Sequence, residues 1–153
     1  MTKKILIVLG AFLAMTFFST QVNAQVDKII GTWKTIDDET GEAKSYVKIV
    51  KSQKNGKYYG KIIKLLKKSP DQKCTECKGK LKGKKIVGMY ILTAMKEDGD
   101  GLKGGKILDP NNGKFYHCSM KLQKGNSDKL DVRGSVDSWG FAGRTQTWHR
   151  LKK

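Results

Sequence analysis

Short runs of β-branched and aromatic residues, separated by turns rich in Gly, Asn and Asp, dominate the pattern of this chain. Eight such runs predict strands over residues 31–37, 45–53, 57–66, 85–95, 102–108, 114–123, 129–136 and 144–151. Asn55-Gly56 is typical of a tight hairpin, because both residues tolerate a positive φ. Outside the runs, only residues 26–30 and 138–143 leave room for a short helix. The pattern therefore predicts an all-β protein.

Apolar and polar residues alternate within several of the predicted strands. Val47 and Ile49 alternate with Tyr46, and a second strand places four residues on one face: Tyr116, Cys118, Met120 and Leu122. One dry face and one wet face are typical of antiparallel sheets. Eight consecutive strands with mostly short links favour an eight-stranded antiparallel up-and-down β-barrel, which has no free edge strand. A β-sandwich is the alternative.

Residues 1–24 have the pattern of a secretory signal peptide. Lys3 and Lys4 precede an apolar stretch over residues 5–18, and Val22-Asn23-Ala24 supplies the small residues that favour cleavage after Ala24. The apolar stretch is shorter than the roughly 20 residues that a membrane-spanning helix needs. We therefore expect an exported protein, periplasmic or secreted, with one domain over residues 25–153 and no transmembrane segment after signal removal.

The chain is strongly basic, with 31 Lys and Arg residues, 14 Asp and Glu residues and a net charge of +17. Loss of the signal segment lowers this charge to +15. Only three of the basic residues are Arg, and Lys is a hydrated point charge rather than a bidentate reader of phosphate or bases. Nucleic acid is therefore not the expected partner. Residues 64–85 hold nine lysines against two acids, a local charge of +7 that fits an acidic envelope surface.

The two ends of the predicted barrel carry complementary residues. Gly31-Thr32-Trp33 opens the first strand and Arg150 lies at the end of the last. In a meander barrel these strand ends are neighbours, so we expect Arg150 to stack on Trp33 and close the barrel floor. Gly31, Trp33 and Arg150 are accordingly predicted to be structural.

These end motifs resemble those of the lipocalin superfamily. A closer resemblance is to a secreted bacterial family known as domain of unknown function 2147. It rests on Gly31-Thr32-Trp33-Lys34, Gly60-Lys61-Ile62, Cys74-x-x-Cys77-Lys78-Gly79-Lys80, Gly105-Lys106-Ile107-Leu108-Asp109-Pro110, Tyr116-x-Cys118 and Gly143-Arg144-Thr145-Gln146-Thr147-Trp148. The resemblance covers almost all of residues 25–153. It implies a lipocalin-like barrel outside the cytoplasm, and it implies no established activity.

Strand parity places the links that follow odd-numbered strands at one rim of the barrel. The cysteine-bearing loop and the aromatic loop over residues 137–143 therefore share a positively charged mouth. We predict a non-enzymatic protein that binds a small amphipathic or anionic molecule. The candidate ligand-binding residues are Trp139, Phe141 and Arg144 at the rim and Tyr46, Tyr90 and Tyr116 on the wall. The alternative is a solid barrel, plugged by the two rim aromatics, that acts as a surface-interaction protein.

Three cysteines allow one disulfide and leave one thiol. Cys74 pairs with Cys77, or one of them pairs with Cys118; the sequence leaves both options open. Thiol–disulfide exchange by Cys74-x-x-Cys77 is a third function class, although the Lys- and Gly-rich segment that follows does not favour the helix that activates such a thiol. Zinc held by the three cysteines and His117 has suitable ligand types, but His117 and Cys118 point to opposite faces of a strand. We expect no metal and no cofactor.

Overall fold

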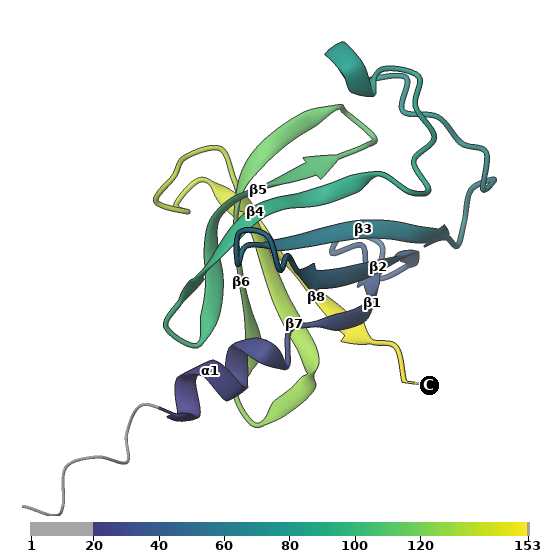
Figure 1. Cartoon of the computed structure of the whole chain (residues 1–153). Coiled ribbons are helices and arrows are strands. Elements are labelled where there is room, and N and C mark those ends of the chain that lie inside the picture. Colours follow the sequence, from purple (N-terminus) through teal and green to yellow (C-terminus); the bar gives the residue numbers. More distant parts are fainter. Residues whose placement is uncertain (1–19, 153) are drawn as a thin grey trace, which may run out of the picture.

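The computed structural model describes residues 20–152, which form a closed barrel of eight antiparallel strands (Figure 1). Each strand pairs with its neighbour in the sequence, and the last strand pairs with the first. The predicted all-β, up-and-down barrel is therefore confirmed. In chain order the elements are α1 (Thr20–Asp27), β1 (Gly31–Ile36), β2 (Ala43–Lys51), β3 (Tyr58–Leu65), the 3₁₀ helix η1 (Gly79–Leu81), β4 (Tyr90–Asp98), β5 (Gly101–Asp109), β6 (Lys114–Gln123), β7 (Asn126–Ser135) and β8 (Gly143–Arg150).

Most strand boundaries differ from the prediction by one to three residues, and three differences are larger. The predicted start of the fourth strand at Lys85 is wrong, because β4 begins at Tyr90. Residues 138–143 contain turns and bends instead of a helix. The helix at the N-terminal end is α1, which overlaps the predicted helical segment only at its last two residues. Residues 1–19 of the expected signal peptide lie outside the described residues, so cleavage after Ala24 stays a prediction.

Alternation along the strands separates the barrel interior from its surface. In β2, Ser45, Val47 and Ile49 are buried, whereas Lys48 and Val50 are exposed. In β6 the buried residues are Cys118, Met120 and Leu122. In these two strands one face supplies the core, as the period of two requires, whereas β4 buries the neighbouring residues Ile91 and Leu92.

The closed end of the barrel is sealed by the segment after α1 and by the end of β8. The Nε1 of buried Trp33 donates to the carbonyl of Ile29, 2.8 Å away. The expected cation–π contact is present, with the Arg150 guanidinium 4.2 Å from the Trp33 ring centroid. Gly31 has φ +142°, and a Cβ there would lie 2.9 Å from Arg150 Nη1, so a side chain would disturb this seal.

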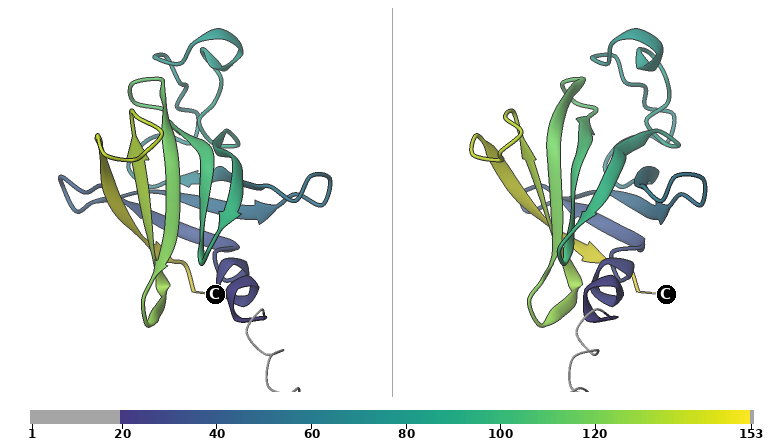
Figure 2. Two further views of the ribbon diagram at one scale, coloured as in Figure 1. Left: turned by 90° about the vertical axis from the view of Figure 1, so that its left-hand side faces the viewer. Right: turned by 60° about the vertical axis from the view of Figure 1, so that its left-hand side comes forward.

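The opposite end carries the links that follow β3, β5 and β7 (Figure 2). The chain between β3 and β4 is the longest of these links and extends away from the barrel. The α-helix and the C-terminus lie at the other end in both views. The end with these loops is called the mouth below.

Candidate ligand cavity

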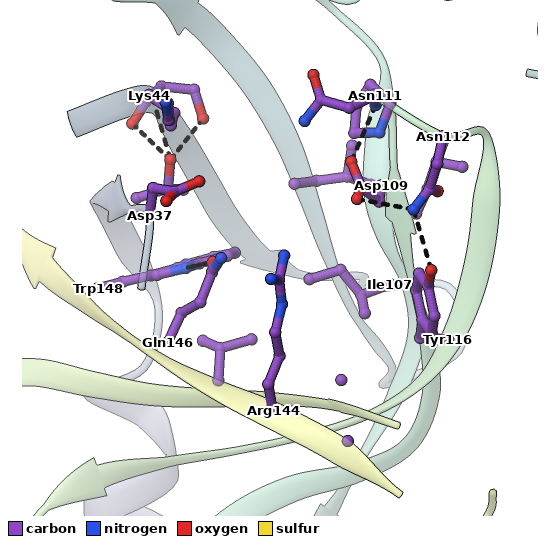
Figure 3. A pocket seen from close by; sticks show the side chains of 18 of the residues that line it. Asp37, Lys44, Ile107, Asp109, Asn111, Asn112, Tyr116, Arg144, Gln146 and Trp148 are labelled. Carbon is purple, nitrogen blue, oxygen red and sulfur yellow. Dashed lines mark hydrogen bonds between the residues drawn. The ribbon is translucent and has the colours of Figure 1, made fainter. Parts of the chain in front are cut away.

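The barrel is hollow at its mouth end, where a cavity of about 520 Å³ opens to solvent (Figure 3). The deeper walls are mainly apolar and come from strands on all sides of the barrel: Ile62, Ile91, Ile107, Leu108, Val132 and Trp148. This volume lies within the range of roughly 300–1,000 Å³ that is typical of small-molecule sites. The cavity therefore has the size and the lining of a ligand pocket.

A few polar groups interrupt the apolar wall. The hydroxyls of Thr35 and Ser45 lie 2.9 Å apart and satisfy each other. Gln146 accepts a 3.3 Å hydrogen bond from Trp148 Nε1 and donates through Nε2 to Asp38. These wall groups are already paired and serve mainly to fix the cavity shape.

Tyr116 differs from the other polar groups of the wall. Its hydroxyl oxygen accepts a 3.0 Å hydrogen bond from Asn112 Nδ2, as Figure 3 shows. Within residues 20–152 the Tyr116 hydroxyl has no acceptor for its own proton. Because a phenol both donates and accepts, this O–H is free to donate to a molecule in the cavity.

Acidic side chains at the mouth are held by backbone amides. Asp37 Oδ1 accepts from the amide of Thr40 at 2.9 Å and from its hydroxyl at 3.0 Å, which lowers the pKa of Asp37. Asp109 accepts from the amide of Asn111 at 2.9 Å and from Asn112 Nδ2 at 3.1 Å. Both carboxylates therefore shape the mouth turns and are poorly placed to act as proton-transfer groups.

Basic side chains at the mouth have carboxylate partners as well. Lys44 lies 3.2 Å from Glu42, and Arg144 Nη1 lies 2.7 Å from Glu39 Oε1. The cavity lining thus holds two basic residues, Lys44 and Arg144, and two acidic residues, Asp37 and Asp109. The expected positive charge belongs to the long β3–β4 link, and the cavity lining itself is balanced.

The six predicted ligand-binding residues fall into three places. Tyr116 and Arg144 line the cavity. Tyr46 and Tyr90 lie on the outer surface, with the ammonium groups of Lys64 and Lys61 above their rings at 5.9 and 5.4 Å. A role in ligand binding stays a prediction for each of them.

Trp139 and Phe141 occupy the third place. They are 79% and 85% exposed on the β7–β8 link and do not line the cavity. Trp139 borders a separate groove of about 820 Å³ along β5, β6 and β7. The cavity is therefore not plugged by these two rings.

Sequence reasoning missed Gln146 and Trp148 as cavity residues. Both stand at even positions of β8 together with Arg144, and all three line the cavity. Residues two apart in a strand share a face, so assigning Arg144 to the interior would also have assigned Gln146 and Trp148 to it.

The cysteine pairing is resolved in favour of the two loop residues. Cys74 and Cys77 form a disulfide with a Cα–Cα distance of 5.4 Å, and both are buried. Cys118 is a buried free thiol, and burial raises its pKa to about 12. A buried disulfide and a thiol that stays protonated favour a structural role over thiol exchange. Within residues 20–152, no cluster of three His, Cys, Asp or Glu side chains is suited to hold a metal ion.

A family model described as "Uncharacterized protein conserved in bacteria (DUF2147)" matches residues 31–150. The chain belongs to this family. It is also similar to a solved structure described as protein HP1028 from the human pathogen Helicobacter pylori, belonging to the lipocalin family. The two chains are 27% identical, with a TM-score of 0.70, and the match covers 81% of this chain and 83% of that one. No curated protein matches the chain. The DUF2147 chain is therefore lipocalin-like, which is typical of a binding protein.

The helices described in residues 20–152 include none that is long and apolar enough to cross a membrane.

Proposed function

We propose that this DUF2147 protein binds one small amphipathic molecule in its barrel and carries out no chemistry on it. The observation that carries the proposal is the cavity itself, which is apolar in its depth and polar at its mouth. The apolar body of the ligand lies against Ile107, Val132 and Trp148, and its polar head lies near Tyr116 and Arg144. The head accepts hydrogen bonds, because the free Tyr116 proton and the Arg144 guanidinium are donors.

The absence of catalysis in this proposal rests on the cavity lining. His117 and Cys118 do not line the cavity, and its carboxylates Asp37 and Asp109 accept hydrogen bonds from backbone amides of their own turns. A general base or nucleophile needs an adjacent activating group. The lining supplies none within the described residues.

We also propose that the protein is exported, either to the periplasm or outside the cell, after cleavage behind Ala24. The resulting chain keeps Val26 and Ile29, which are buried at the closed end of the barrel. The disulfide between Cys74 and Cys77 agrees with an oxidising compartment.

The cavity is tested with 1-anilinonaphthalene-8-sulfonate, a fluorescent probe with an apolar body and an anionic head. Ile107→Trp fills the cavity with a larger ring, and we expect it to weaken probe binding by at least about tenfold. Ile63→Trp, on the outer surface of β3, is the matched control and should bind as the wild type does. Tyr116→Phe removes one donor and should weaken binding about fivefold, the effect of one hydrogen bond.

Melting temperatures are recorded in parallel, because loosely packed states also bind this probe. Unchanged probe binding by a stably folded Ile107→Trp variant would refute the cavity as the site. Mass spectrometry of small molecules that co-purify from the native host then identifies the physiological ligand.

A further inference from the structure

A hairpin that contains the Cys74–Cys77 disulfide projects from the mouth end of the barrel (Figures 1 and 2). We call residues 73–85 the basic knob. Lys73 and Lys85 form an isolated antiparallel bridge at its base, and Cys74 exchanges 2.9 Å backbone hydrogen bonds with Lys84 and Gly83. The buried disulfide between Cys74 and Cys77 closes the turn that leads into η1. The basic knob is therefore an ordered element with a defined shape.

The basic knob is anchored to the wall of the cavity mouth. Cys74 Sγ lies 3.3 Å from the carbonyl oxygen of Pro110, in the β5–β6 turn. Gly113 of the same turn packs so closely on Glu76 that a Cβ there would overlap the Glu76 carbonyl. The position of the knob relative to the cavity is thus fixed by direct contact with residues of the mouth.

Five of the six lysines of the basic knob form no salt bridge within residues 20–152. Four of them, Lys78, Lys80, Lys82 and Lys84, are exposed around η1, and the fifth is Lys73 at the base of the knob. Lys85 differs, because it pairs with Asp71 at 2.6 Å. Four lysines held together in this way repel one another, and a surface with negative charge relieves that repulsion.

The same end of the barrel presents two exposed aromatic rings on a braced loop. Arg133 Nε and Nη2 donate to the carbonyls of Gly140 and Phe141 at 2.7 and 3.1 Å. The carboxylate of Asp137 accepts from the Phe141 amide at 3.0 Å, and backbone hydrogen bonds of this kind lower the pKa of Asp137. The loop is thus ordered, although Trp139 and Phe141 are almost fully exposed. Ordered, exposed aromatic rings are characteristic of proteins that sit at a membrane interface.

We propose that the mouth end docks on an anionic, phosphate-bearing lipid bilayer, with the basic knob over the headgroups and Trp139 and Phe141 at the interface. A bilayer surface presents many phosphate charges without fixed positions, and the point charge of Lys is suited to such a surface. A single phosphate bound through two hydrogen bonds would favour Arg instead. Docking directs the cavity mouth toward the membrane, so an amphipathic molecule can pass between bilayer and barrel. The docking itself does not depend on the cavity being occupied.

Vesicle co-sedimentation tests the proposal. The purified protein is mixed with vesicles of phosphatidylethanolamine and phosphatidylglycerol in a 3:1 ratio, and with vesicles of phosphatidylcholine alone. We expect salt-sensitive binding to the anionic vesicles and none to the neutral ones. Each lysine near an anionic surface raises the affinity for the membrane about fivefold. The variant K78Q/K80Q/K82Q/K84Q should therefore bind the anionic vesicles on the order of a hundredfold or more weakly than the wild type.

A matched variant removes the same charge away from the basic knob. Lys54, Lys96, Lys124 and Lys129 are exposed, are free of carboxylate partners within the described residues and lie on or beside the β2–β3, β4–β5 and β6–β7 links. K54Q/K96Q/K124Q/K129Q should bind anionic vesicles within about fivefold of the wild type. Equal losses in the two quadruple variants would overturn the proposal, because they would reflect net charge alone.

The aromatic contribution is read from fluorescence. Trp33 and Trp148 are buried, so a blue shift on adding anionic vesicles reports on Trp139, and Trp139→Phe should abolish it. Binding to heparin as tight as binding to vesicles, without any Trp139 shift, would overturn the proposal in favour of an acidic glycan. Ile107→Trp should bind vesicles like the wild type, so failure of the cavity proposal and failure of membrane docking are distinguishable.

Discussion

Removal of the Arg150 side chain tests the closed end of the barrel directly. The guanidinium stacks on Trp33 at 4.2 Å and donates to the carbonyls of Ile30 and Ser127 at 3.0–3.3 Å, with a further bond to Lys28. Only 22% of the Arg150 side chain is exposed. Arg150→Ala therefore opens the floor over a buried tryptophan and leaves several carbonyls without their donor.

The expected loss of stability in Arg150→Ala follows from these contacts. A partly desolvated cation–π pair is worth about 1 kcal/mol. A hydrogen bond from a charged donor contributes about 1.5–3 kcal/mol when buried. Water replaces part of the donor set at this partly exposed position, so we count one such bond and expect a loss of about 3 kcal/mol in the free energy of unfolding. At about 3 °C per kcal/mol for a domain of this size, the melting temperature falls by about 10 °C.

Arg144→Ala is the matched control, because it deletes the same side chain at the other end of the barrel. Arg144 is 54% exposed, and its partner Glu39 is more exposed still. Such surface ion pairs contribute about 0–1 kcal/mol, so Arg144→Ala should lower the melting temperature by less than about 3 °C. Thermal and urea unfolding of both variants give the comparison. A loss below about 1 kcal/mol for Arg150→Ala, or equal losses for both variants, would refute the assignment of Arg150 as the seal.

Two further measurements address the loops. Thiol titration without reductant should detect no thiol in the native protein and one, from buried Cys118, in denaturant; three thiols would contradict the disulfide. Gly113→Ala should cost clearly more stability than Gly83→Ala. Both positions have a positive φ, which costs about 1 kcal/mol for Ala, but only at Gly113 would the new Cβ overlap Glu76. Equal costs in urea unfolding would show that the knob does not pack on the β5–β6 turn.

Alternation predicted antiparallel strands with one buried and one wet face, and the short links and the matching strand ends favoured a barrel over a sandwich. In β6 the pattern also placed Tyr116 on the same face as Cys118 and Met120, and this residue does line the cavity. In β2 the same pattern placed Tyr46 opposite Val47, and Tyr46 lies outside. The period of two therefore carries more information about the site than the presence of an aromatic residue does.

The start of β4 was mispredicted because burial does not require a strand. Ile86 and Met89 are buried while they belong to the long link, where they tie it to the barrel. The amide of Ile62 donates to the Met89 carbonyl at 3.0 Å, and the amide of Met89 donates to the Ile86 carbonyl at 3.1 Å. Apolar residues that anchor a loop have the same spacing as residues of a strand, so the sequence alone cannot separate them.

The hollow mouth half of the barrel was not predictable from the sequence. An eight-stranded barrel is filled by its own side chains or left partly open according to how those side chains pack across the interior. The large residues Trp33, Tyr58 and Met95 are fully buried in the structure, whereas Ile107 and Tyr116 are only partly covered. The end of the barrel at which the large side chains pack depends on strand register and bulges, and not on composition.

The seam that closes the barrel also has consequences for how the chain folds. β1 and β8 pair at two positions, Trp33 with Arg150 and Lys34 with His149, and the amide of Leu151 adds a bond to Thr32. During synthesis β1 emerges first and β8 last. One edge of β1 therefore stays unpaired until the final residues arrive, which exposes it to association with other chains. Loss of residues 149–151 would remove these pairings and leave an open sheet, so the end of β8 is needed to keep the barrel closed.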